Sequence, residues 1–119
     1  MKHQSGRVKL NLKGSHKKSL VRNQIIHMIE HGSLTSTVAT IKEVRRHVEK
    51  VVTIARTGNN FNARRRVHAL VPYKQSAILK LFADIAPRYT TRPGGYTRII
   101  PLGVRVSDQA RIARLEWVA

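Results

Sequence analysis

The sequence predicts a two-layer α+β fold in which helices pack on one face of a small mixed sheet. Residues 15–86 place apolar side chains at the spacing of amphipathic helices, whereas residues 96–118 are rich in β-branched residues and alternate apolar with polar positions. A chain of 119 residues has the length of one ordinary domain. We therefore expect a basic extended arm at 1–14 and one globular domain at 15–119, in the order arm, helix, strand, three helices and two strands.

The first helix is expected to run from about residue 15 to His31, with Ser15 as its N-cap and Gly32 as its stop. Its apolar stripe follows helical spacing and consists of Val21, Ile25, Met28 and Ile29. The Thr-rich segment Ser33–Val38 follows and predicts a short strand.

The second helix has the clearest apolar pattern of the chain and is predicted over about 38–56. Its stripe consists of Ile41, Val44, Val48, Val51, Val52 and Ala55. Thr37 or Thr40 is the expected cap, and Thr40 has capping-box spacing to Glu43. The polar segment 57–60 ends this helix.

Two further helices are expected at about 62–71 and 74–86, because Pro72 separates them and Pro87 closes the second. Their inward-facing residues are predicted to be Ala63, Val67, Leu70, Val71, Ile78, Leu81, Phe82 and Ile85.

The end of the chain predicts two strands, 96–106 and 111–118, joined by a turn at 107–109. Pro101 and Gly103 indicate that the first strand lies at an edge or carries a bulge. The second strand is expected to be half-buried, with its inward positions at Ala113, Leu115 and Trp117.

The charge of the chain is its strongest functional signal. There are 23 Lys and Arg against 6 Asp and Glu, a net charge of +17. Such an excess is best tolerated beside a polyanion, so nucleic acid is the expected partner and an anionic membrane surface the alternative. No apolar run has the ~18 residues of a membrane span, and the polar face of the 38–56 helix mixes charge signs. Aromatic residues make up 5% of the chain, which favours recognition of backbone and shape over base stacking.

Catalysis and metal binding are disfavoured. The absence of cysteine excludes disulfides and thiolate metal sites. The string His27-Met28-Ile29-Glu30-His31 has the H-x-x-E-H spacing of a zinc hydrolase, but a catalytic zinc also needs a third ligand and a dry cavity. We interpret it as a polar helix edge that faces solvent or RNA. With no Gly-rich phosphate loop and only scattered acids, we predict no enzyme, cofactor, metal or small-molecule substrate.

Two clusters of arginines are candidate phosphate-binding sites. Arg64-Arg65-Arg66 opens the third helix and spans about 200° of its circumference, so at least one guanidinium must point away from the core. The second cluster surrounds two glycines that permit a close approach of the backbone, and it comprises Arg88, Tyr89, Arg92, Gly94, Gly95, Tyr96 and Arg98. The alternatives are a solvated helix face for the first cluster and, for the second, a tight loop that leads into a strand with Tyr96 in the core.

Short motifs over the whole chain match one known family. The motifs of the first half are Met1-Lys2-His3, Gly6-Arg7, His16-Lys17-Lys18, Arg22-Asn23, Thr35-Ser36-Thr37 and Lys42-Glu43. The most diagnostic stretch holds Leu81-Phe82, Pro87-Arg88-Tyr89, Arg92 and Gly94-Gly95-Tyr96-Thr97-Arg98-Ile99. The final hairpin adds Gly103, Arg105, Asp108, Ala110, Glu116 and Val118. From about residue 1 to 118 the chain thus resembles the bacterial large-subunit ribosomal protein seventeen family.

The resemblance implies a non-catalytic structural constituent of the ribosome that binds large-subunit ribosomal RNA near the rim of the peptide exit tunnel, beside neighbouring large-subunit proteins. Because the opening motif matches the family's own start, we expect no transit peptide and a bacterial cytoplasmic location, with an organellar ribosome as the alternative. Charge and resemblance together predict the following RNA-binding residues: Lys2, His3, Arg7, Lys9, Lys13, His16, Lys17, Lys18, Arg22, Arg64, Arg65, Arg66, Arg88, Arg92, Gly94, Gly95, Tyr96, Arg98 and Arg105.

Charge alone also fits an architectural DNA-binding protein. The ribosomal hypothesis predicts co-sedimentation with the large subunit, whereas the DNA hypothesis predicts a symmetric dimer that bends duplex DNA. The zinc hydrolase is a third hypothesis, and elemental analysis for zinc tests it.

Overall fold

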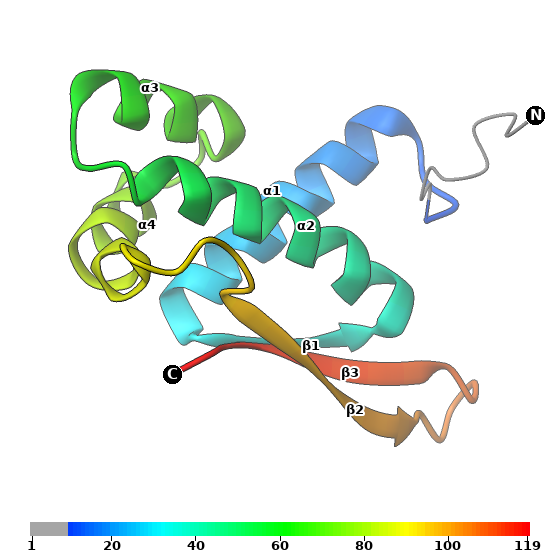
Figure 1. Ribbon diagram of the computed structural model, residues 1–119. Helices are drawn as coiled ribbons and strands as arrows, with labels where there is room; N and C mark the ends of the chain where they lie inside the picture. Colours follow the sequence, from blue (N-terminus) through cyan, green and yellow to red (C-terminus); the bar gives the residue numbers. More distant parts are fainter. Residues whose placement is uncertain (1–9) are drawn as a thin grey trace, which may run out of the picture.

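The computed structural model describes residues 10–119, which form two layers (Figure 1). A three-stranded sheet lies along one side of the molecule, and the helices pack against one face of it. The predicted α+β class and the predicted order of helices and strands are confirmed. Four residues of the arm that are predicted to contact RNA lie outside the described residues, namely Lys2, His3, Arg7 and Lys9.

Helix α1 spans Gly14–His31 and buries its predicted stripe. Gly32 ends the helix in the left-handed conformation, with a φ of 81° and an N–H that donates to the carbonyl of Met28 at 3.0 Å. The prediction of Ser15 as N-cap is wrong, because Lys13 occupies that position and no side chain caps the helix there. The carbonyl of Lys13 already accepts the N–H of Lys17 at 2.8 Å, so Ser15 falls within the first turn.

Strand β1, Ser33–Thr37, leads directly into helix α2, Val38–Ala55. Thr37 occupies the N-cap position, as one of the two expected alternatives, but its side chain caps no backbone N–H and lies 3.0 Å from the hydroxyl of Thr40. The predicted capping box of Thr40 and Glu43 is not formed, because Thr40 lies inside the helix and the Glu43 carboxylate is buried against basic side chains.

Helix α3, Phe61–Leu70, is capped by Asn60, whose side-chain oxygen accepts the N–H of Ala63 at 2.8 Å. Helix α4, Gln75–Lys80, continues into a π-helical turn η1, Leu81–Ile85, and a 3₁₀ turn η2, Ala86–Tyr89. The sequence predicted a single helix here. Pro87 lacks the N–H that an α-helix would donate back along the chain, so the backbone leaves α-helical geometry as it approaches this residue.

The sheet has the order β1-β3-β2, with β2 at Thr97–Val104 and β3 at Arg111–Trp117. The prediction of a mixed sheet is wrong in this detail, because the central β3 is antiparallel to both neighbours. The predicted edge position and bulge of β2 are confirmed. The register shifts between Pro101 and Gly103, and Gly103 has the positive φ of 105° that glycine tolerates.

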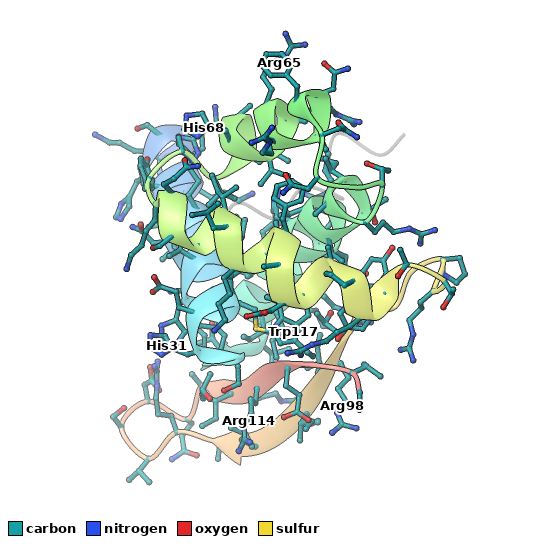
Figure 2. The ribbon with its side chains drawn as sticks, turned by 90° about the vertical axis from the view of Figure 1, so that its left-hand side faces the viewer. His31, Arg65, His68, Arg98, Arg114 and Trp117 are labelled. Carbon is teal, nitrogen blue, oxygen red and sulfur yellow. The ribbon has the colours of Figure 1, made fainter. Side chains whose placement is uncertain are left out.

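The two faces of the sheet differ in character. Leu34, Ala113 and Leu115 point into the helical layer and are buried in the core. Alternate positions carry Arg98, Arg114 and Glu116, on the face that the helices leave uncovered (Figure 2). Basic residues are therefore presented both by the helices and by the far side of the sheet.

Candidate nucleic-acid interface

The N-cap and the N-terminal half of α1 carry the first group of predicted RNA-binding residues in the described part of the chain. The exposed members of this group are Lys13, His16 and Lys18. Arg22 is half-buried: its Nη1 donates to the hydroxyl of Tyr73 at 3.4 Å, and its guanidinium carbon lies 5.6 Å from the centre of that ring. The hydrogen bond from Arg22 lowers the pKa of Tyr73. This contact attaches α1 to the segment between α3 and α4.

Lys17, also in the predicted set, reaches across to α2. Its Nζ lies 3.3 Å from Oε1 of Glu43, whose side chain is 3% exposed. Arg46 and His47 approach the same oxygen at 2.8 and 3.2 Å. Burial raises the pKa of Glu43, but the hydrogen bonds from His47 and Lys17 and the charge of Arg46 outweigh it, so the net shift is downward. Glu43 is thus a carboxylate that holds α1 against α2 and neutralises part of the local charge.

Helix α3 presents the arginine cluster most openly. Arg64, Arg65 and Arg66 are all exposed, which confirms and exceeds the prediction that at least one would point outward. Among residues 10–119, no acidic side chain forms an ion pair with any of the three. Figure 2 shows Arg65 extending away from the body of the molecule, so this cluster offers unneutralised guanidinium groups to solvent.

Phe61 is a candidate that the sequence reasoning missed. It is the first residue of α3, its side chain is 70% exposed, and the guanidinium carbon of Arg65 lies 6.0 Å from its ring centre. A signal was present in the sequence: Phe61 precedes the inward-facing Ala63 by two positions, about 200° around the helix. An aromatic residue that is off the apolar stripe and beside arginines indicates an exposed ring.

The loop that precedes β2 holds the second predicted cluster. Arg88 is exposed, and the two glycines adopt positive φ values of 146° at Gly94 and 64° at Gly95. Arg92 is half-buried, donates to the carbonyl of Gly95 at 3.4 Å and places its guanidinium carbon 5.9 Å from the ring centre of Tyr89. The turn therefore depends on the backbone freedom of glycine, and Arg92 supports that turn.

Tyr96, part of the predicted set, lies in the core instead of on the surface. Its side chain is 1% exposed, and its ring centre is 5.2 Å from that of Tyr89. Its hydroxyl lies 3.1 Å from Nη1 of Arg56 and 3.2 Å from the hydroxyl of Thr53. Arg56 also donates to the carbonyl of Arg92, which fixes the loop to the end of α2. The ring of Tyr96 has no face open to a base, so the alternative of a core tyrosine holds.

The sheet arginines are paired with carboxylates. On the uncovered face, Nη2 of Arg98 lies 2.5 Å from Oε1 of Glu116, and Nη1 of Arg114 lies 3.9 Å from Oε2 of the same residue. In the β2–β3 turn, Nη2 of Arg105 lies 2.7 Å from Oδ2 of Asp108. The hydrogen bonds from Arg105 lower the pKa of Asp108 to about 2. Arg98 and Arg105, both in the predicted set, therefore have an internal partner.

The predicted residues do not converge on one surface. Figure 2 places Arg65 at one end of the molecule and Arg98 and Arg114 at the opposite end, with the helical layer between them. A single flat contact cannot engage both ends. The arrangement fits a polyanion that borders the protein on more than one side.

The histidine string of α1 has an exposed geometry. His27 and His31 are exposed, with ring centres 4.5 Å apart, while the carboxylate of Glu30 lies 2.6 Å from Nζ of Lys74. The hydrogen bond from Lys74 lowers the pKa of Glu30. Within residues 10–119, no group of three His, Cys, Asp or Glu is arranged to hold a metal ion.

No helix of this part of the chain is long and apolar enough to cross a membrane.

The sequence matches a family of known proteins. The family model of ribosomal protein L17 matches residues 20–118. The large ribosomal subunit protein bL17 of Sphingopyxis alaskensis is 45% identical over 118 residues, covering 99% of this chain and 84% of that protein. The bL17 of Helicobacter acinonychis is 42% identical over 118 residues, covering 99% of this chain and 100% of that protein. The bL17 of Bdellovibrio bacteriovorus is 44% identical over 106 residues, covering 89% of this chain and 58% of that protein.

These matches define the class first: the molecule is a ribosomal protein, with a structural and not an enzymatic role. More specifically, the chain belongs to the ribosomal protein L17 family, whose bacterial members compared above carry names that assign them to the large subunit. The family resemblance noted from the sequence motifs is thereby confirmed.

Proposed function

We propose that this protein binds large-subunit ribosomal RNA as a structural constituent of the bacterial large ribosomal subunit, through contacts to phosphates and to RNA shape. One observation carries the proposal: three consecutive arginines on α3 are exposed, and within residues 10–119 no acidic side chain pairs with them. Guanidinium groups match phosphate oxygens with paired hydrogen bonds, and a cluster that no described carboxylate neutralises retains its charge for an external polyanion.

The distribution of acids supports the same proposal. Among the described residues, the acidic side chains that form ion pairs with basic residues are Glu30, Glu43, Glu49, Asp108 and Glu116. Since these carboxylates are neutralised internally, the net charge of +17 is expressed through the remaining basic side chains. A surface of this kind attracts a polyanion such as RNA and repels other basic proteins.

The site within the ribosome follows from the family resemblance. We propose a position near the rim of the peptide exit tunnel, beside neighbouring large-subunit proteins. Placement of basic groups at both ends of the molecule fits a protein embedded between RNA segments (Figure 2). Cross-linking of intact large subunits, followed by identification of the linked RNA and proteins, tests this position. Cross-links confined to sites remote from the tunnel rim would contradict it.

Salt dependence tests the mode of binding. With ~8 phosphate contacts, affinity for a large-subunit RNA fragment should fall by about four decades between 50 and 200 mM salt, because each contact releases counterions. The measurement is filter binding or fluorescence anisotropy over this range, with a DNA duplex of equal length as competitor. An affinity that is nearly independent of salt would exclude phosphate-driven binding. Stronger binding and bending of the DNA duplex would favour an architectural DNA-binding protein.

A further inference from the structure

The ring of Phe61 is largely exposed in the part of the chain that the structure describes. It stands at the first turn of α3 with 70% of its side chain accessible, and Arg65 one turn later contributes the cation–π contact at 6.0 Å. The buried face of α3 is formed by Ala63 and Val67, and Phe61 lies about 200° away from Ala63, on the side that also carries arginines. An exposed aromatic ring within an arginine cluster is a feature of single-strand nucleic-acid contacts.

A hollow adjoins this ring between α3 and α4. Its volume is about 380 Å³, near the lower end of the range of ligand pockets. Its apolar wall is formed by Ile78, Leu79 and Phe82, and Leu79 is 57% exposed. The ionisable residues that line it are all basic: Arg64, Arg65 and His68. Among the described residues, therefore, no carboxylate lines this hollow to repel a phosphate.

A second pocket lies between α1 and α2. It also combines apolar and basic residues, but Glu43 is among the residues that line it. The carboxylate of Glu43 is already held by Lys17 and Arg46 at 3.3 and 2.8 Å. Two basic residues of that pocket are therefore already engaged by a carboxylate, whereas no carboxylate among the described residues lines the hollow beside Phe61. The α3–α4 hollow is thus the better match for a nucleotide.

We propose that Phe61 is a stacking platform for an unpaired RNA base, which occupies the α3–α4 hollow while Arg64 and Arg65 bind its flanking phosphates. Every base has a π-face, so an aromatic ring can stack on it without reading its hydrogen bonds. Folded RNA offers such bases at bulges and loops. This inference rests on the proposed RNA-binding function and specifies its partner as RNA with an unpaired nucleotide.

The experiment compares two RNA probes with four protein variants. The probes are a 20-base-pair RNA duplex and the same duplex with one unpaired adenine. The variants of the full chain are Phe61→Ala, Phe61→Trp, Arg65→Gln and Val106→Ala. Val106 is a matched control, because it is 93% exposed and apolar but lies beyond the end of β2. Affinity is measured by fluorescence anisotropy at several salt concentrations, and thermal unfolding checks that each variant folds.

The proposal gives a distinct expectation for each variant. Phe61→Ala should weaken binding to the bulged duplex by about tenfold and leave the paired duplex unchanged, because it removes one stacked base. For this variant the slope of log affinity against log salt concentration should equal that of the parent, since a stacking contact releases no counterions. Arg65→Gln should reduce the slope by about one for the bulged probe. Phe61→Trp should retain the preference for the bulge, and Val106→Ala should bind as the parent does.

Other outcomes separate the two proposals. If the parent binds both duplexes with steep salt dependence and Phe61→Ala binds the bulged probe equally well, the stacking platform is disproved while RNA binding stands. If the parent binds neither duplex at 50 mM salt, both the RNA-binding function and the stacking platform are contradicted. If Phe61→Ala changes neither affinity but lowers incorporation into large subunits, the hollow accepts a neighbouring protein and the inference is wrong.

Discussion

The arginines of α3 and those of the sheet differ in what surrounds them. Arg64, Arg65 and Arg66 form no ion pair with the described acidic side chains, whereas Arg98 and Arg114 both approach Glu116. The two groups lie at opposite ends of the molecule (Figure 2). Arginines of the same chain are therefore exposed without a described acidic partner on α3 and are partly neutralised by Glu116 on the sheet.

The ion pairs of the sheet change the local electrostatic potential more than they change the free energy of unfolding. An exposed arginine–carboxylate pair contributes only about 0–1 kcal/mol to folding, so these pairs are not needed to hold the sheet together. A carboxylate within a few ångströms nevertheless cancels much of the potential that an approaching phosphate would feel. Counting basic residues thus overstates the RNA-binding surface, and the relevant quantity is the charge that remains after internal pairing.

The prediction with the largest expected effect removes three arginine charges from α3 in one variant and three from the sheet region in another. The α3 variant changes Arg64, Arg65 and Arg66 to Gln, and the sheet variant changes Arg98, Arg105 and Arg114 to Gln. Both lose the same formal charge. We expect RNA affinity at about 0.1 M salt to fall by roughly two to three decades for the α3 variant and by less than tenfold for the sheet variant.

Salt titration and thermal unfolding accompany the affinity measurement. The α3 variant should unfold within about 0.5 kcal/mol of the parent, because its substitutions are exposed and glutamine is a good helix former. Equal losses of affinity for the two variants would mean that only net charge matters. A larger loss for the sheet variant would reverse the assignment of the interface.

Substitution of Glu43 makes the opposite change, because it removes a buried negative charge and leaves the basic side chains in place. In Glu43→Gln, Lys17 and Arg46 no longer face a negative charge at 3.3 and 2.8 Å. The free energy of unfolding should fall by about 2 kcal/mol, because charged hydrogen bonds are lost between α1 and α2. RNA affinity should rise severalfold as the local potential increases. Denaturant unfolding and RNA titration on the same samples check whether the two quantities move in opposite directions.

Glu49→Gln is the matched control for this variant. Glu49 pairs with Arg45 at 3.7 Å, its side chain is 26% exposed, and it also accepts hydrogen bonds from Thr97. It should lose stability without a comparable rise in RNA affinity, because a single arginine is involved. Unchanged stability of Glu43→Gln would show that its carboxylate does not hold α1 to α2.

Much of the fold could be predicted from the sequence because it depends on local periodicity. The stripes of α1 and α2 and the alternation of β3 place the core residues correctly. The details that failed depend on contacts between distant segments. The capping box expected for Thr40 and Glu43 follows a local rule, yet the Glu43 carboxylate pairs with Lys17 of α1 instead.

The candidate site was predictable to a similar degree. That at least one of Arg64, Arg65 and Arg66 is exposed follows from the helical period, whereas the exposure of all three does not. The pairing of Arg98 with Glu116 does not, because these residues are 18 positions apart and are brought together by strand register. Pattern alone could not choose between the two interpretations of Tyr96, because its burial depends on Arg56 and Thr53, which belong to the distant α2 end.

The smallest expected effect concerns Arg105 and its partner Asp108, which test whether pairing in the β2–β3 turn persists in solution. The pKa of Asp108 is lowered to about 2 from 3.8, first by the hydrogen bond from Arg105 and then by that from the N–H of Ala110. Because the folded pKa is depressed, the contribution of this group to stability is complete above about pH 4 and is lost as the pH falls toward 2. NMR titration of the Asp108 carboxyl carbon should therefore show a midpoint near 2 in the parent. In Arg105→Gln the midpoint should rise toward 3.8 without reaching it, since the hydrogen bond from Ala110 remains. A midpoint at the ordinary value in the parent would mean that Arg105 is unpaired and belongs with the α3 arginines as charge available to RNA.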